Sequence, residues 1–286
     1  MRLADPKQKF QDWFTQQWVI LWGKKINAED YPWLMGPFGN LTGIGEDFIQ
    51  QLATKENLTI QRNSQTRGLI PSMDMLHLSQ SELANLSQEV IGFYEKTALY
   101  NLHFSVKWNP FFKGFGILVT KLFSKRINQL NVPTRNTKNA ENIKSEIITL
   151  TDPASGTIKY TIWFRSFIST GKVIYSGIYS TCTLPSGKTC VKAVFPLPKG
   201  NATVIMLPSV GLNGELILNS AGKKLGDAGF YFLLNDSKGK YWAQFIRSFR
   251  DQLIIGVVND QLTAEQMLTL WGKKVLQFKY SINLKK

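Results

Sequence analysis

The chain has 286 residues, and its content of 43% hydrophobic and 12% aromatic residues excludes an intrinsically disordered protein. It lacks an apolar run of about 18 residues, which excludes a membrane-spanning helix. The stretch MRLADPKQKFQDWF at the start is too polar for a signal peptide. The formal net charge of +14 favours anionic partners. We expect a cytoplasmic protein that could also attach to the surface of an anionic membrane.

Helical and loop patterns dominate residues 1–78. Phe and Trp residues recur at helical spacing over residues 5–24. The stretch YPWLMGPFGNLTGIG, residues 31–45, is rich in Gly and Pro and interrupts this pattern. A short helix is predicted over residues 46–54. We expect residues 1–78 to form a layer of helices and loops.

The second region, residues 79–286, opens with a helix signal. Ser79 and Glu82 have the spacing of a capping box, and the helical pattern continues to Thr97. In the strand that follows, apolar residues alternate with polar ones and predict one buried face, made by Leu102, Phe104, Val106 and Trp108.

The stretch NPFFKGFGILVTKLFSKRINQL, residues 109–130, predicts an amphipathic helix. At about 100° per residue, its phenylalanines gather on one side and Lys113, Lys121 and Lys125 on the other. Arg126 falls within the apolar arc, where it must either extend its charged end toward water or meet an anion. We expect the phenylalanines to pack on a sheet, with docking on a membrane as the alternative.

Positive charge concentrates between Lys107 and Lys144, where eight basic residues stand against one acid, Glu141. Such a patch would attract phosphates, carboxylates or anionic lipids. It could equally be a solvated face that keeps the protein soluble. Nucleic acid is the less expected partner, because the aromatic residues are not interleaved with lysines on one exposed face.

Beyond residue 142 the pattern is that of an antiparallel meander. Strand-like runs of Ile, Val, Thr, Tyr and Phe alternate with turn signals at residues 152–156, 169–172, 185–187, 213–214 and 236–239. This excludes a doubly wound parallel sheet and favours a strongly curved sheet or a barrel.

The last predicted elements are a short helix over residues 263–272 and a closing strand over residues 275–282. The predicted fold class is α+β, with N-terminal helices and a curved antiparallel sheet or barrel gripped by helices. The two regions are expected to form one compact unit.

Two strands suggest a ligand cavity. Along residues 157–168, one face is apolar and the other mixes aromatic with isolated polar residues, and residues 241–249 have the same character. A sheet covered by helices and loops, without a cavity, is the alternative. The candidate ligand-binding residues are Arg126, Arg165 and His103 for an anionic group and Trp163, Tyr175 and Phe245 for an apolar body.

The chain has two cysteines, Cys182 and Cys190, placed symmetrically about Ser186. They would face each other in a hairpin, where a disulfide is conceivable. In a reducing compartment we expect two free thiols.

Catalytic and cofactor motifs are missing: the chain has no HExxH, GxSxG, P-loop or GxGxxG motif, so no metal and no cofactor is predicted. The glycine-rich stretch of residues 222–232 could cradle an anion or be a wide hairpin loop. His77 is expected to be structural. The acid–base candidates are scattered along the chain: His103, Glu146, Asp227 and Asp251.

Three stretches carry a resemblance to a known family: FGILVTKLFSKRINQLNVP, CVKAVFPLPKGNATVIM and GKKLGDAGFYF. They resemble a family of uncharacterised bacterial proteins, the soluble YndJ-like proteins, over roughly residues 93–283. The resemblance implies a bacterial protein, cytoplasmic or membrane-peripheral. It implies no catalytic residues.

Three hypotheses for the function follow. The leading one is a protein that binds an apolar small molecule with an anionic head, such as a fatty acid or lipid, in the cavity of the curved sheet. The second is an enzyme, similar to a cyclase or decarboxylase, which requires a group with a strongly shifted pKa in the cavity. The third is a basic surface module for anionic membrane or nucleic acid.

Overall fold

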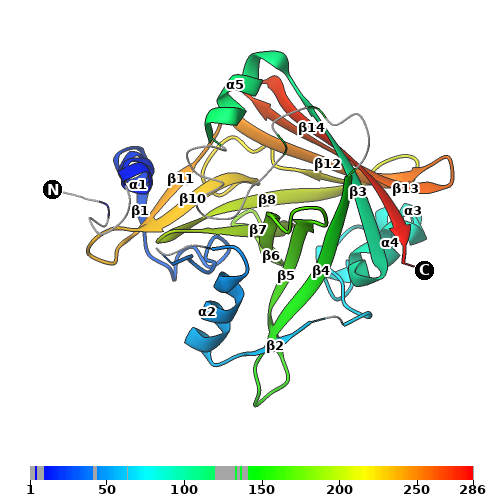
Figure 1. Ribbon diagram of the computed structural model, residues 1–286, viewed down its shortest axis with the longest axis horizontal. Coiled ribbons are helices and arrows are strands. Elements are labelled where there is room, and N and C mark those ends of the chain that lie inside the picture. The colour runs from blue at the N-terminus through cyan, green and yellow to red at the C-terminus, as the bar shows by residue number, and fades with distance from the viewer. Residues whose placement is uncertain are drawn as a thin grey trace.

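A computed structural model describes residues 4, 10–40, 44–62, 64–119, 133, 136 and 141–285. In this part of the chain, ten antiparallel strands close into a barrel (Figure 1). In their order around the barrel they are β8 (Gly200–Val210), β7 (Thr189–Leu197), β6 (Val173–Thr183), β5 (Ile158–Phe167), β4 (Glu141–Thr151), β3 (Tyr100–Trp108), β14 (Lys273–Leu284), β13 (Gln261–Leu270), β12 (Phe249–Val258) and β9 (Leu216–Asn219).

Strand β8 closes the barrel because it changes partner along its length. Its first half pairs with β10 (Gly229–Asn235), whereas Leu207–Val210 pair with β9. Beyond β10, the sheet continues through β11 (Tyr241–Phe245) to β1 (Lys24–Ile26) as a wing outside the barrel. A further short strand, β2 (Thr59–Gln61), pairs with β4. The prediction of a strongly curved antiparallel sheet or barrel is confirmed.

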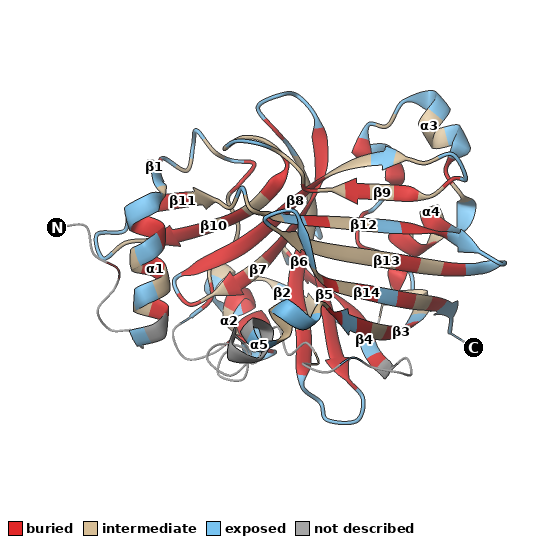
Figure 2. Ribbon diagram, turned by 90° about the horizontal axis from the view of Figure 1, so that it is seen from above, coloured by how far each residue is buried: buried red, intermediate tan, exposed pale blue. Residues whose placement is uncertain are grey.

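The helices cover the outside of the sheet and one end of the barrel. Helix α1 (Phe10–Trp22) packs on the wing, and α2 (Asp47–Glu56) packs on the outer face of β4 and β5. The short helices η1 (Met73–Leu76), α3 (Gln80–Asn85), α4 (Gln88–Glu95) and η2 (Thr97–Leu99) lie where β3 begins and β14 ends. Figure 2 shows α1 and the α3–α4 pair at opposite sides of the molecule.

The main core lies inside the barrel. Along β3 and β14 every second residue is buried there, including Phe104, Phe278 and Tyr280. Val90 and Phe93 of α4 join the same core from the end of the barrel. A separate cluster on the outer face joins α2 to β4 and β5. Among the described helices, none is long and apolar enough to cross a membrane.

Several local predictions are confirmed. The helices expected near residues 5–24 and 46–54 are α1 and α2, and the turn signals between the strands of the meander all lie in turns. The capping box is present, with the Ser79 backbone N–H donating to Glu82 Oε2 at 3.0 Å and the Glu82 backbone N–H donating to Ser79 Oγ at 3.3 Å.

Three local predictions are wrong. Residues 263–272 are not a helix: they belong mainly to β13, because β12 and β14 pair with that segment on both edges. The strand expected over residues 241–249 is two strands, since β11 belongs to the wing and β12 to the barrel. The helix from Ser79 to Thr97 is interrupted at Leu86, which has an extended backbone.

The amphipathic helix expected over residues 109–130 is described in part. Helix α5 (Pro110–Val119) forms its first half, after the end of β3 (Figure 1). The rest of that helix, including Arg126, lies outside the described residues, as does most of the basic patch between Lys107 and Lys144.

Candidate functional site

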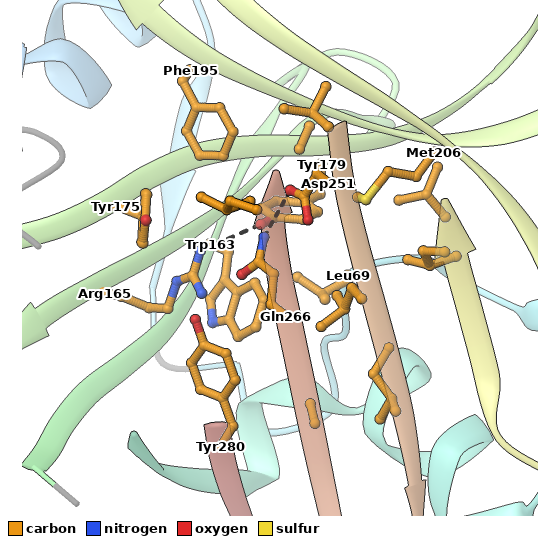
Figure 3. Close-up of a pocket in the computed structure, with 18 of the residues that line it drawn as sticks. Leu69, Trp163, Arg165, Tyr175, Tyr179, Phe195, Met206, Asp251, Gln266 and Tyr280 are labelled. Atoms are coloured by element: carbon orange, nitrogen blue, oxygen red, sulfur yellow. Dashed lines mark hydrogen bonds between the residues drawn. The ribbon is translucent and has the colours of Figure 1, made fainter. Parts of the chain in front are cut away.

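A cavity of about 170 Å³ lies inside the barrel, among inward-facing residues of most of its strands (Figure 3). Its lining is mostly apolar. Helix α4 and the segment before it contribute Leu69, Phe93 and Tyr94. The aromatic walls from the strands are formed by Trp163, Tyr175, Tyr179, Phe195, Phe230, Phe249 and Tyr280.

Among the described residues that line this cavity, Arg165 is the only cation. The alternation of β5 turns it inward between Trp163 and Phe167, and it is only 6% exposed. Its guanidinium carbon lies 3.9 Å from the centroid of the Trp163 ring and 4.7 Å from that of Tyr175, distances typical of cation–π contacts. The cavity therefore holds a positive charge between two aromatic faces.

The hydrogen bonding of Arg165 is incomplete. Its Nη2 donates to the Tyr179 hydroxyl at 3.4 Å, and it also interacts with the Tyr280 hydroxyl. Its Nε is buried without a partner, and none of the described carboxylates lies within ion-pair distance of the guanidinium. A buried, unpaired charge is costly. The site therefore favours an anion beside Arg165.

Asp251 is the acid of the cavity. It points inward from β12 and is 5% exposed. Its Oδ2 accepts a hydrogen bond of 2.8 Å from Gln266 Nε2, while its Oδ1 is buried without a partner. Burial raises the pKa of this carboxyl to about 7, although the Gln266 hydrogen bond works in the opposite direction. Near neutral pH, Asp251 can therefore either donate or accept a proton.

Tyrosine hydroxyls supply the other polar groups. Burial raises the pKa of Tyr280 to about 12, and it also raises the pKa values of Tyr175 and Tyr179. The positive charge of Arg165 lowers all three pKa values, but less than burial raises them. These hydroxyls therefore remain protonated and can act as hydrogen-bond donors at neutral pH.

The structure brings three of the six predicted site residues together. Arg165, Trp163 and Tyr175 all line the cavity. Phe245 does not, because β11 lies in the wing, where its ring packs at 5.1 Å from that of Tyr231. His103 lies on the face of β3 opposite to the buried residues, and Arg126 lies outside the described residues.

Sequence reasoning missed how Asp251 and Gln266 meet. In the sequence Asp251 is one of several scattered acid–base candidates, and Gln266 falls in the segment predicted as a short helix. The signal was present in β12, where Phe249, Asp251, Leu253 and Ile255 alternate as one face. A single carboxylate on an otherwise apolar face indicates a buried acid.

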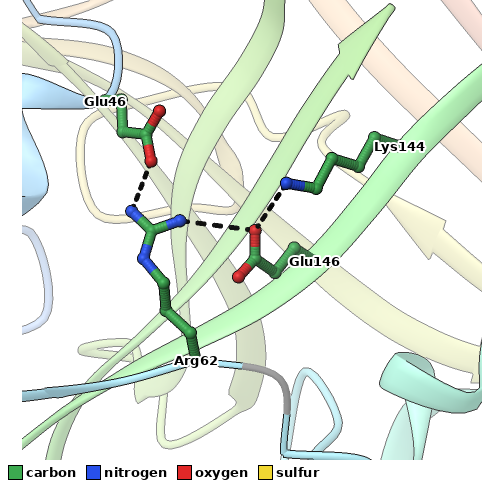
Figure 4. Close-up of polar contacts among 4 residues, drawn as sticks. All are labelled: Glu46, Arg62, Lys144 and Glu146. Carbon is green, nitrogen blue, oxygen red and sulfur yellow. Dashed lines mark hydrogen bonds and ion pairs between the residues drawn. The ribbon is translucent and has the colours of Figure 1, made fainter. Parts of the chain in front are cut away.

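The other polar candidates have internal partners. Glu146 binds Arg62 Nη1 at 3.4 Å and Lys144 Nζ at 3.5 Å, and Arg62 in turn binds Glu46 at 2.5 Å (Figure 4). This network joins the segment after β2 to β4, beside an open surface groove.

The glycine-rich stretch of residues 222–232 holds an anion of its own. Asp227 Oδ2 accepts hydrogen bonds from the backbone N–H groups of Lys223 and Lys224, at 2.9 and 3.2 Å. His77 bonds the Thr189 hydroxyl at 2.9 Å. These contacts favour structural roles for both segments.

The two cysteines are directly opposite each other on β6 and β7, and both are free thiols. Burial raises the pKa of Cys182 to about 11 and that of Cys190 to about 12. Such thiols are poor nucleophiles.

The chain is similar to the "Uncharacterized membrane protein YndJ" of Bacillus subtilis (strain 168). The two are 27% identical over 267 residues, which cover 93% of this chain and 46% of the relative. This supports the resemblance to YndJ-like proteins. The chain thus spans about half the length of that relative. No family model and no solved structure matches the chain.

This comparison corrects two expectations. The similarity cannot be confined to residues 93–283, because its 267 residues must include much of the region 1–78. The relative is named a membrane protein, whereas the resemblance was to soluble proteins. The cytoplasmic location stays a prediction.

Proposed function

We propose that the protein binds a small molecule with an anionic group inside the barrel. A barrel with an interior cavity is compatible with ligand binding. The observation that carries the proposal is Arg165, a buried guanidinium with an unpartnered Nε and no carboxylate within ion-pair distance in the described chain.

The gain on binding would come from two sources. A ligand carboxylate or phosphate would receive charge-assisted hydrogen bonds from Arg165, and these are stronger than neutral ones. The body of the ligand would displace water from aromatic walls, which contributes about 25 cal/mol for each Å² of apolar surface buried. The rings of Trp163 and Tyr175 contact the guanidinium, and its Nε has no hydrogen-bond partner in the protein.

Native mass spectrometry of the freshly purified protein, followed by extraction of any bound molecule, tests this function. We expect a bound acid in the wild-type protein and none in Arg165→Met. Arg250→Met is the matched control, because Arg250 is an exposed arginine of the same barrel. Retention of the same bound mass by Arg165→Met would contradict the proposal.

Asp251 favours a second candidate function, an enzyme that acts on the same kind of ligand. Asp251 lines the cavity, the pKa of its carboxyl group is raised to about 7, and its Oδ1 has no hydrogen-bond partner. A general acid or base works best with a pKa near the operating pH. If the protein converts the extracted molecule, Asp251→Asn should retain binding and lose turnover. Unchanged turnover would exclude this role.

A further inference from the structure

The size of the cavity limits the ligand whose binding is proposed above. A dry cavity of about 150 Å³ in another protein holds one benzene molecule. The barrel cavity, at about 170 Å³, is close to that size. Its interior accommodates one six-membered ring with few substituents, and it is too small to enclose a long alkyl chain. The expectation of a fatty acid or lipid therefore does not suit the cavity.

The walls favour a flat ring. Trp163, Tyr179, Phe195, Phe230 and Phe249 all contribute ring surface to the cavity. Their rings already meet neighbouring rings in edge-to-face or tilted contacts, such as Trp163 with Tyr179 at 5.5 Å and Phe230 with Phe249 at 4.8 Å. An aromatic ligand would extend this packing, since offset and edge-to-face contacts add to the energy of burial.

The cavity has two distinct polar points. Arg165 Nε needs an acceptor, and Asp251 Oδ1 is a second buried atom without a partner. The two side chains form no ion pair with each other, so neither charge is compensated by the other. In Figure 3, Arg165 and Tyr280 lie on one side of Gln266, and Asp251 lies on its other side.

The two points require different chemical groups. A carboxylate suits Arg165, because a guanidinium edge donates to it in a planar geometry. At Asp251 a second carboxylate would be repelled whenever the acid is ionised. A hydroxyl group can donate to Oδ1 or accept from it, so it pairs with Asp251 in either protonation state.

We propose that the ligand is a single-ring aromatic acid with a hydroxyl group away from its carboxylate, and that Arg165 binds the carboxylate while Asp251 binds the hydroxyl. This inference rests on the proposed function. Gln266 donates a hydrogen bond to Oδ2 of Asp251, which leaves Oδ1 as the unpaired oxygen of this carboxyl group.

Calorimetric titration of the full-length wild-type protein tests the inference, with benzoate, its three hydroxy isomers, 4-methylphenol and hexadecanoate as probes. We expect 3- or 4-hydroxybenzoate to bind roughly tenfold more tightly than benzoate. A tenfold difference in Kd corresponds to the net free energy of about one added hydrogen bond. The 2-hydroxy isomer should bind no better than benzoate, because its hydroxyl lies beside the carboxylate. Hexadecanoate should not bind.

Variants of Asp251 and Arg165 test which group of the ligand each residue binds. Asp251→Leu should bind benzoate and 4-hydroxybenzoate equally, and Arg165→Met should lose the preference for benzoate over 4-methylphenol. Arg250→Met should behave as the wild type. If Asp251→Leu does not fold, the comparison of the hydroxy isomers in the wild-type protein decides the matter without it.

Each contrary result has a separate meaning. Equal affinity for benzoate and all three hydroxy isomers would overturn the second binding point. Tight, Arg165-dependent binding of hexadecanoate would overturn the size limit and leave the proposed function intact. Equal affinity for 4-methylphenol and 4-hydroxybenzoate would overturn the proposed function itself. Binding of none of the probes would overturn the inference, while the mass spectrometry above would still decide the function.

Discussion

At the scale of single residues, the cavity is defined by two unsatisfied buried atoms. Most buried polar atoms in folded proteins have partners, and here Arg165 Nε and Asp251 Oδ1, on two residues that line the same cavity, have none. Groups kept in this state reduce stability unless a ligand or water compensates them. Both residues should therefore behave differently from structural residues when they are replaced.

Replacement of Arg165 by Met should separate stability from binding. An apolar side chain of similar length removes a buried, unpaired charge, which is a gain in stability because such a charge is costly to bury. The loss of its cation–π contacts offsets part of this gain. Urea denaturation without ligand should show Arg165→Met within about 1 kcal/mol of the wild type or more stable. A loss of several kcal/mol would identify Arg165 as structural.

Asp251 should make stability depend on pH. Its pKa is raised to about 7 in the folded protein, against about 3.9 in an unfolded chain. The folded state thus holds more protons between these values. The contribution of Asp251 is fully present below about pH 4 and is lost as the pH rises through about 7.

Urea denaturation at pH 5 and pH 8 measures this dependence. The wild type should lose stability relative to Asp251→Asn as the pH rises, by on the order of 1–3 kcal/mol. Parallel pH profiles of the two proteins would show that the buried carboxyl does not titrate in this range.

At the scale of elements, the junction of α3 and α4 depends on a distant turn. Gly214, in the turn between β8 and β9, accepts a hydrogen bond of 3.0 Å from the Ser87 backbone N–H at the start of α4. A Cβ atom on Gly214 would lie 2.7 Å from the carbonyl oxygen of Asn85. This turn therefore links the closing strands of the barrel to the helices at its end.

Gly214 and Gly239 form a matched pair for testing this link. Both have φ in the left-handed region, +77° and +71°, but a Cβ atom on Gly239 would meet nothing within 4 Å. Gly239→Ala should cost about 1–2 kcal/mol, from its backbone alone. Gly214→Ala should cost a further 1–3 kcal/mol, approximately, because it also forces apart packed groups. If thermal denaturation shows the same loss of stability for both variants, the junction of α3 and α4 accommodates the added methyl group without cost.

At the scale of the whole molecule, residues 1–78 cover sheet surface that would otherwise be exposed. Phe48, Ile49 and Leu52 of α2 are buried against Ile148 and Leu150 of β4. Large exposed apolar patches lead to association or aggregation. Residues 79–286 are therefore not expected to be stable alone.

A chain that begins at residue 79 should bind a hydrophobic dye and aggregate, while the full chain unfolds in one step. Coincident transitions by circular dichroism and tryptophan fluorescence would show this single step. A soluble, cooperatively folded fragment would show instead that residues 79–286 form an independent domain.

Features of this fold are predictable from the sequence when the residues that interact are close together in the chain. The capping box at Ser79 and the turns between strands depend on neighbours within a few residues, and they are correctly predicted. Segment 263–272 has an ambiguous local pattern, and its pairing with β12 and β14 decides that it is mostly strand. Local pattern likewise fails to place Phe245, because the pairing of β11 with β10 and β1 puts its strand outside the barrel.

The sequence alone predicts the antiparallel meander, its turns and the common face of Trp163, Arg165 and Phe167, because strand alternation has a period of two residues. The pairing of β8 with β9, which closes the barrel, becomes visible only in the folded structure. The folded structure also brings Arg165 and Asp251, which are far apart in sequence, into one cavity. Such non-local meetings depend on the register and closure of the whole sheet, which local patterns do not encode.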